Sequence, residues 1–293
     1  MSHYSIWMLE YAYIPECPMS SLVYGRHNQG TVKLPYGYVL LKGQGTTILV
    51  DCGYNHDAYG KHLAEFYGVH NWHAPAEVLA ECEITPEEIQ HVIITHAHFD
   101  HMGGLRFFPN AKFYLQEREL SQWAWTMALP RQFRWMMSAA DPADIMYAAE
   151  LAEAGRLVSV KGDSEDILPG IDLRLAADSH TAGSQFVVIR NDGNRNSQDA
   201  YVCAGDLVYR HENLHGGTPD DPMYVPVGLA VGSQTNLLMT SQAIMDAVQH
   251  DYKRVLAAHE ENMPNIYPSR KTNLGLCITE IALAKGEKSL VAN

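Results

Sequence analysis

Short runs of apolar and β-branched residues, bounded by turn residues, recur along most of the chain. Runs of this kind fit the pleated, half-buried surface of a β-sheet. We predict strands at 36–41, 46–51, 91–95, 112–116, 171–177, 185–190, 200–206 and 254–259. The stretches between them predict helices at about 58–67, 75–81, 116–128, 141–154, 240–250 and 275–285. Strands in both halves of the chain, separated by helices, predict an α/β protein with two sheets packed together and helices outside.

No Ser/Gly/Pro-rich linker, charge block or repeat divides the 293 residues, so we expect one domain over residues 1–293. The composition, 46% hydrophobic and 19% charged, is that of an ordinary globular protein. The N-terminal stretch "MSHYSIWMLEYAYIPECP" lacks a basic segment followed by an apolar run, and no stretch approaches the roughly 18 apolar residues of a membrane span. We therefore expect a cytoplasmic protein with no membrane partner.

Charge and cysteine content narrow the functions further. The formal net charge of -13 disfavours a nucleic-acid partner, because binding phosphates needs a basic surface. The five cysteines are odd in number, widely spaced and without a CxxC pair. That pattern fits neither a disulfide framework nor a zinc site built from thiolates. We expect most of the cysteines to be small core residues.

Polar residues with metal-binding chemistry stand where the predicted strands end. Asp51 ends one strand, "HAHFDH" (residues 96–101) follows another, and His180 follows a third in "DSH". Asp206 and His259 end two more. Binding and catalytic groups tend to sit on loops that a rigid scaffold holds, so these strand ends predict one site if they converge on one edge.

The "HAHFDH" cluster follows the apolar run "VII" and Thr95, and two glycines come after it at 103 and 104. Alternate side chains of an extended loop share a face, so His96 and His98 can grip one ion while Asp100 and His101 turn toward a neighbouring position. Imidazole and carboxylate without thiolate suit zinc, with iron or manganese as alternatives. A run of solvated histidines is the other interpretation, and the apolar strand before the cluster disfavours it.

"HAHFDH" preceded by "VIIT", "ILVDCG" upstream, and three later ligand-type residues at strand ends together resemble the metallo-β-lactamase superfamily over nearly the whole chain. The resemblance implies an αββα sandwich, two mixed β-sheets flanked by helices, with two zinc ions per chain at one edge. It implies a first metal on His96, His98 and His180, a second on Asp100, His101 and His259, and Asp206 bridging the two.

Within that superfamily the chain is most similar to the N-acyl-homoserine lactonases. Phe99 stands before the aspartate of the cluster, Tyr209 stands three residues after the bridging aspartate, and "LPGIDLRLAADSHTAGSQFVVI" resembles their strand, metal histidine and following strand. Where those lactonases usually read "PGHxPGH", this chain has "DSHTAGS". The resemblance implies a quorum-quenching type of lactonase, in which a hydroxide shared by two metals attacks a small-molecule lactone.

Catalytic roles follow for two residues on this interpretation. Tyr209 would donate to the oxyanion that develops on the carbonyl, and Asp100 would carry the proton that the leaving alkoxide needs. The ring itself stays open: homoserine lactone, another lactone, or a cyclic amide or imide. A glyoxalase-II-like thioesterase is the nearest rival, although no clear set of basic residues for glutathione is visible. A true β-lactamase, a flavodiiron-type oxidoreductase and a metal-stabilised binding protein fit less well.

Three other features bear on the site. Asp51 is expected to accept an imidazole N–H and fix the tautomer of a metal ligand. Residues 122–137 hold several Trp and Met, which favours a core segment or a homodimer face over a substrate-binding patch. The loop from Tyr209 to about Thr235 is rich in Gly and Pro and predicts a pocket-shaping lid, whereas His211 and His215 within it are not expected to be ligands.

Overall fold

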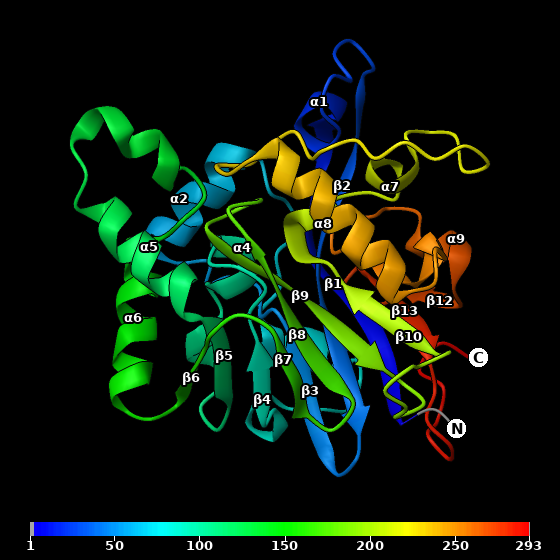
Figure 1. Cartoon of the computed structure of the whole chain (residues 1–293). Coiled ribbons are helices and arrows are strands. Elements are labelled where there is room, and N and C mark those ends of the chain that lie inside the picture. Colours follow the sequence, from blue (N-terminus) through cyan, green and yellow to red (C-terminus); the bar gives the residue numbers. More distant parts are fainter. Residues whose placement is uncertain (1–2, 293) are drawn as a thin grey trace.

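The computed structural model describes residues 3–292 and contains two β-sheets. The larger, eight-stranded sheet has the order β12-β13-β1-β2-β3-β4-β5-β6 (Figure 1). Its strands β3 to β6 run parallel to one another, and the remaining pairs are antiparallel. The bounds are β1 (Tyr4–Pro18), β2 (Thr31–Gly43), β3 (Thr46–Val50), β4 (His91–Ile93), β5 (Lys112–Gln116), β6 (Leu157–Val160), β12 (Ser269–Lys271) and β13 (Cys277–Ala282).

The second sheet has five strands in the order β11-β10-β9-β8-β7. Its bounds are β7 (Ser164–Leu168), β8 (Ile171–Ala177), β9 (Gly183–Arg190), β10 (Ala200–Cys203) and β11 (Val255–Leu256). Only β10 and β11 pair in parallel. Buried side chains from both sheets, such as Ile6, Ile93 and Val187, form one apolar cluster that holds the sheets face to face. Burial of this apolar area is the main force that joins the two layers.

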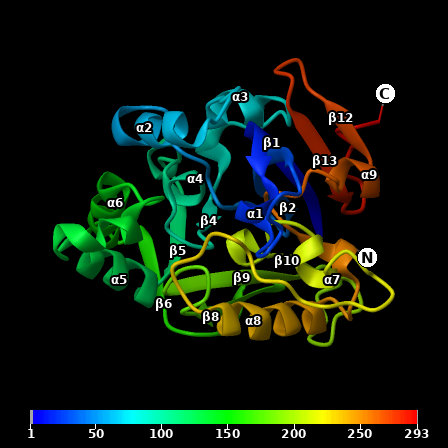
Figure 2. The ribbon, with the colours of Figure 1, turned by 90° about the horizontal axis from the view of Figure 1, so that it is seen from above.

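Helices cover the outer faces of both sheets (Figure 2). Against the larger sheet pack α3 (Pro75–Ala80), α5 (Glu117–Met127) and α6 (Pro142–Glu153), while α8 (Gln234–Ala247) lies along β8 and β10 of the smaller one. The remaining helices are α2 (Ala58–Tyr67), the one-turn α1 (Met19–Leu22), α4 (Phe99–Met102), α7 (Glu212–His215) and α9 (Met263–Ile266), and short 3₁₀ segments at Pro86–Glu88, Leu105–Phe107, Arg131–Met137, Gly205–Leu207 and Tyr252–Arg254. The predicted αββα arrangement is therefore confirmed.

One predicted element has the wrong type. Residues 275–285 were expected to form a helix, but Cys277–Ala282 is strand β13, which pairs with β1 on one side and β12 on the other. Its middle residues are buried on both faces, so the alternation that marks a half-buried strand is absent. Pairing with β1 supplies the backbone hydrogen bonds and overrides the local preference.

Several other boundaries also differ. Helix α8 begins at Gln234 rather than near residue 240, because the Ser233 side chain accepts a hydrogen bond from the Asn236 amide and caps it. Strands β1, β6, β7 and β12 were not predicted at all. Residues Tyr4 to Ala12 of β1 are buried almost without interruption, and such a run carries no period-two signal.

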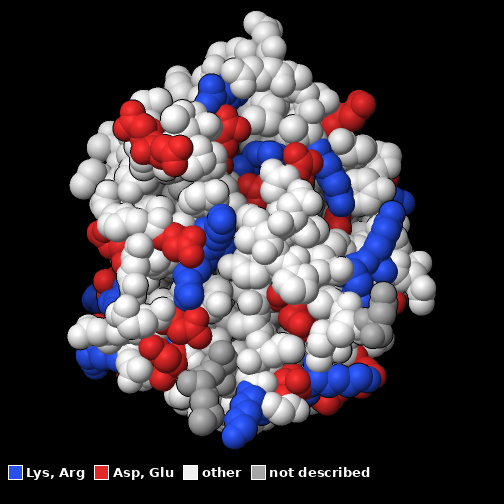
Figure 3. Space-filling view, turned by 90° about the vertical axis from the view of Figure 1, so that its right-hand side faces the viewer, with Lys and Arg blue, Asp and Glu red and all other residues white. Residues whose placement is uncertain are grey.

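The helices, the surface charge and the cysteines add three observations. Within residues 3–292, none of the helices combines the length and apolar character needed to span a bilayer. On the face shown in Figure 3, Lys and Arg side chains stand among Asp and Glu instead of forming a continuous basic area. All five cysteines are free, and four of them are buried, as expected for small core residues.

Candidate metal centre

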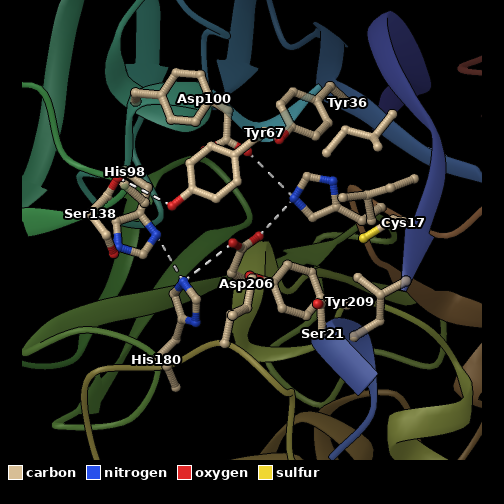
Figure 4. Close-up of a pocket in the computed structure, with 18 of the residues that line it drawn as sticks. Cys17, Ser21, Tyr36, Tyr67, His98, Asp100, Ser138, His180, Asp206 and Tyr209 are labelled. Carbon is tan, nitrogen blue, oxygen red and sulfur yellow. Dashed lines mark hydrogen bonds and ion pairs between the residues drawn. The ribbon is translucent and has the colours of Figure 1, made fainter. Parts of the chain in front are cut away.

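Loops at one edge of the sandwich bring the seven predicted ligands together. Figure 4 shows four of them, His98, Asp100, His180 and Asp206, at the wall of a pocket. The "HAHFDH" loop and helix α4 follow β4 of the larger sheet, whereas the other three ligands follow strands of the smaller sheet. All seven side chains are buried. Their nitrogen and oxygen atoms form two groups within which the atoms lie no more than 4.8 Å apart: His96, His98, His180 and Asp206 in the first, and Asp100, His101 and His259 in the second.

Asp206 lies between the two groups and faces both. Its Oδ2 is 3.6 Å from His96 Nε2 and 3.3 Å from His180 Nε2. Its Oδ1 is 3.0 Å from His101 Nε2 and 3.1 Å from His259 Nε2. Each carboxylate oxygen thus belongs to a different group, which is the geometry that a bridging ligand requires.

Each group also has close contacts of its own. In the first, His98 Nδ1 lies 3.0 Å from His180 Nε2. In the second, Asp100 Oδ2 lies 3.4 Å from His101 Nε2 and 3.6 Å from His259 Nε2. The donor atoms therefore point inward at two neighbouring positions rather than outward into solvent.

Hydrogen bonds at Nδ1 orient two of the histidine rings. Asp51 Oδ2 lies 2.7 Å from His101 Nδ1, and the same carboxylate accepts bonds from the backbone amide and hydroxyl of Thr95. Nδ1 of His259 lies 2.7 Å from the Pro35 carbonyl oxygen, to which it donates. A ring whose Nδ1 donates leaves the lone pair of Nε2 free to bind a cation. Asp51 thus makes the contact expected of it, while Thr95 and Pro35 were not anticipated.

Several buried atoms at the centre are suited to bind a metal because they make no hydrogen bond. Nε2 of His96, Nε2 of His101 and Oδ1 of Asp206 are buried, and none makes a hydrogen bond within residues 3–292. A buried polar atom without a partner costs about 1–3 kcal/mol, and a cation bound by these atoms would offset that cost. Imidazole nitrogens with carboxylate oxygens and no thiolate form a ligand set suited to zinc.

The electrostatics divide the centre into neutral and charged parts. Burial and the neighbouring His180 ring lower the pKa of His98 to about 3, so this ring is neutral and able to bind a cation. Burial acts to lower the pKa of His101, but Asp206, Asp100 and Asp51 together raise it well above its usual value. The carboxylates therefore attract positive charge to the centre, either as protons or as metal ions.

A cavity of about 300 Å³ opens directly onto the two groups. Its inner wall carries Tyr36, Phe99 and Tyr209 beside the metal ligands, and its lining includes no Lys or Arg. Glu16 is the single charged residue of the lining besides Asp100 and Asp206. Large apolar side chains stand exposed at the rim, namely Phe66 (71%), Trp135 (66%) and Leu229 (43%).

Two tyrosines stand next to the ligands. The Tyr209 ring centroid lies 5.2 Å from that of His259 and 5.9 Å from that of His180. Burial and the charge of Asp206 raise the pKa of Tyr209 well above its usual value, so the phenol keeps its proton and can donate it in a hydrogen bond. Tyr36 meets His259 edge-on at 5.2 Å and was not singled out, because "PYGYVLL" reads as an ordinary strand.

The structure places the other predicted features in different surroundings. His211 and His215 do not line the cavity: His211 is buried, with its Nε2 2.9 Å from the Val255 carbonyl oxygen. Residues 122–137 were interpreted as a core segment or a homodimer face rather than a substrate-binding patch. Trp123 is buried, as that interpretation expects, but Trp135 lines the cavity. The loop after Tyr209 contributes Leu229, Ala230 and Val231 to the lining, as expected of a pocket-shaping loop.

A sandwich of this kind with a buried His/Asp cluster at one edge has the fold of a metallohydrolase. Residues 35–245 match the family model of the metallo-beta-lactamase superfamily, which is more than half of the chain. The chain therefore belongs to the metallo-beta-lactamase superfamily.

Solved structures with similar folds include a hydrolase of the beta-lactamase superfamily named AbOPH, with 18% identity, TM-score 0.68 and coverage of 98% of this chain and 97% of that one. The dizinc quorum-quenching lactonase AidC has 16% identity, TM-score 0.63 and coverage of 98% and 97%. A mutant of B. thuringiensis AiiA with N-decanoyl-L-homoserine bound at the active site has 17% identity, TM-score 0.64 and coverage of 90% and 96%. These likenesses support the fold.

The sequence match to a curated relative covers a much shorter segment. An uncharacterized protein of Caenorhabditis elegans is 42% identical over 53 residues. The match spans 18% of this chain and only 15% of that protein.

Proposed function

We propose that the protein is a zinc-dependent hydrolase that opens the ring of a neutral, apolar-substituted lactone. His96, His98 and His180 would hold one ion, Asp100, His101 and His259 a second, and Asp206 both. When bound, the pair of ions supplies Lewis acidity and lowers the pKa of a shared water toward neutrality.

The chain's own residues would handle the substrate and the protons. The phenol of Tyr209 stays protonated beside the ligands and would donate a hydrogen bond as negative charge develops on the carbonyl oxygen. Asp100, an ionised carboxylate buried at the floor of the cavity, would take the proton that the attacking water gives up and pass it to the leaving alkoxide. The rings of Tyr36 and Phe99 would hold the ring of the substrate against the centre and exclude water from it.

The observation that carries this proposal is the character of the cavity that ends on Asp206. Apart from Glu16 and the ligands themselves, its lining is apolar or uncharged. A glutathione thioester carries carboxylates and would need basic side chains, which the lining does not offer. A neutral ester with an apolar substituent matches both the floor and the walls.

The similar structures agree with this choice. AidC is described in complex with the product N-hexanoyl-homoserine, and AiiA with an N-decanoyl-homoserine at its active site. Both bound molecules are opened lactones that carry an apolar acyl chain. A cyclic amide or imide has similar ring geometry and is the alternative substrate class.

A substrate screen with metal-quantified protein tests the proposal. The panel would contain lactones with and without a long acyl chain, a glutathione thioester, and cyclic amides and imides. We expect hydrolysis of apolar lactones, about two metal ions per chain, and loss of both activity and one ion in His98→Ala. Preferred turnover of the glutathione thioester, or full activity with one ion per chain, would overturn it.

A further inference from the structure

Glu119 is a fully buried carboxylate that the metal centre described above does not use. It lies in the first turn of α5 and is 0% exposed. Its Oε1 accepts hydrogen bonds from the Ala97 amide (2.9 Å) and the Trp123 indole (2.7 Å). Its Oε2 accepts from the Thr181 hydroxyl (2.8 Å) and the Gly183 amide (2.7 Å). Four donors and two oxygens make a completely satisfied carboxylate.

Apart from Trp123, which lies on α5 itself, the partners of Glu119 belong to the two segments that hold the first group of ligands. Ala97 stands between His96 and His98 on the loop after β4 of the larger sheet. Thr181 directly follows His180 on the connection between β8 and β9 of the smaller sheet. One carboxylate thus ties together ligand loops that come from different sheets.

The contact is close enough to require a glycine. A methyl group at Gly183 would meet the Glu119 backbone nitrogen at 2.3 Å and its Cα at 2.8 Å. These distances are well inside van der Waals contact, so any side chain at 183 would push the loop away from α5. The β8–β9 loop is therefore held against α5 by shape as well as by hydrogen bonds.

We propose that Glu119 is a positioning residue that sets the separation of the two loops and so tunes the affinity of the first metal site. The inference rests on the proposed two-metal site. Metal–ligand distances tolerate changes of only about 0.2 Å, so loops that relax apart would weaken one site selectively. Outer hydrogen-bonding partners of metal ligands typically affect metal affinity about 10- to 100-fold.

A glutamine at position 119 would remove this function with little change of shape. In either orientation of the glutamine side chain, the NH₂ group would replace a carboxylate oxygen that now accepts two hydrogen bonds. At least one ligand loop would therefore lose its hydrogen bonds to residue 119. We expect the two ligand loops to move apart, and because glutamine has nearly the same volume as glutamate, the substitution leaves no cavity. Thr181→Val removes only the hydroxyl bond and should have a smaller effect in the same direction.

Glu280 offers a matched control. It is a buried glutamate on β13, and it accepts from the Trp7 indole (3.2 Å), the Leu290 amide (3.0 Å) and the Ser289 hydroxyl (3.0 Å). The donor types are those of Glu119, but none of them adjoins a metal ligand. Glu280→Gln therefore reports the stability cost of losing such a carboxylate without any effect on the loops.

The test measures zinc affinity of metal-free protein by competition with a chromophoric chelator, in two backgrounds. In the His259→Ala background the second site is weakened, so the affinity measured for the tightly bound ion is that of the first site. In the His98→Ala background the first site is weakened, and the measured affinity is that of the second. We expect Glu119→Gln to lower affinity about 10- to 100-fold in the first background and to leave it unchanged in the second. Glu280→Gln should change affinity in neither. Circular dichroism confirms that each variant is folded, and Thr181→Val serves if Glu119→Gln is not.

Equal affinity losses in the two backgrounds, or no loss in either, would overturn the positioning role. These results differ from a failure of the proposed function, in which the parent protein itself would not bind two ions or would not open a lactone. A parent that binds two ions and hydrolyses lactones, with a Glu119→Gln variant that behaves like Glu280→Gln, would refute the inference alone.

Discussion

Two buried charged clusters in this protein have opposite hydrogen-bonding character. Asp172 on β8 pairs with Arg190 at the end of β9, with Nε to Oδ2 at 3.1 Å, and also accepts the Asp166 amide at 2.9 Å. No buried atom of these two side chains lacks a partner within residues 3–292. Around Asp206, in contrast, Oδ1 of that carboxylate and the Nε2 atoms of His96 and His101 lie close to charged or polar neighbours, but they make no hydrogen bond in the part of the chain that the structure describes.

This difference in hydrogen bonding indicates which cluster binds a ligand. In the Asp172 cluster the charges neutralise each other, so the cluster is complete without a ligand. In the Asp206 cluster, inward-pointing acceptors from two sheets converge and remain unsatisfied, and folding alone does not stabilise such an arrangement. Substitutions in the Asp172 cluster should therefore lower stability, whereas substitutions in the Asp206 cluster should lower metal binding and catalysis.

The largest expected effect comes from Asp206→Asn. Removing the charge that faces both groups should reduce bound metal below two ions per chain and lower hydrolysis on the order of a thousandfold or more, since the water would lose its activation by two cations. Metal analysis and steady-state kinetics measure the two results. A variant that retained two ions and near-normal kcat would contradict the bridging geometry.

Asp172→Asn should produce the opposite pattern. Loss of its charge leaves Arg190 with only the more exposed Asp166 as a carboxylate partner, and breaking a buried pair of this kind typically costs a few kcal/mol. We expect the free energy of unfolding to fall by about 2–3 kcal/mol, as measured by urea denaturation, with unchanged metal content and kcat. If metal content fell instead, the two clusters would not be independent.

Tyr209→Phe should have a smaller effect, confined to catalysis. The substitution keeps the ring against His259 and removes one hydrogen bond where charge develops, so we expect kcat to fall about 10-fold with metal content and thermal stability unchanged. Tyr201→Phe, in the core between the sheets, is the control and should leave kcat unchanged. Equal kcat for Tyr209→Phe and the parent on a chemically limited substrate would make Tyr209 a packing residue.

The smallest effect on activity comes from a pH dependence of stability that lies outside both clusters. Burial and the nearby Asp141 raise the pKa of Asp144 to about 7, and Arg106 offsets this only in part. Because the folded-state pKa is raised, the stability contributed by the protonated form is present below about pH 4 and is lost as the pH rises through 7. Asp144→Asn should therefore be more stable than the parent at pH 8, and this gain should shrink to near zero below pH 4.

Urea unfolding of the metal-free proteins across this pH range measures the difference without the pH dependence of metal binding. A gain of the same size at pH 4 and pH 8 would show that the substitution acts through packing or helix capping and not through the charge of Asp144.

The sequence alone determined the ligand-bearing loops. The "HAHFDH" cluster, His180, Asp206 and His259 could be predicted because each stands directly after an apolar strand, and strand ends with polar residues are local features of the chain. The central strands β2, β3, β5, β8 and β9 could be predicted for the same reason. A family resemblance carried by these ligand residues and the strands before them then indicated the fold.

Tertiary structure alone decided what those loops do together. Strand β1 and the strand identity of residues 277–282 depend on pairing between the two ends of the chain, and a segment buried on both faces does not show that pairing in its own pattern. The contact of Glu119 with both ligand loops, and the position of Trp135 at the cavity rim, likewise join residues distant in the sequence. Local pattern fixes which side chains a strand presents, but only packing of the two sheets brings these side chains within bonding distance, because that packing depends on the apolar area of the whole chain.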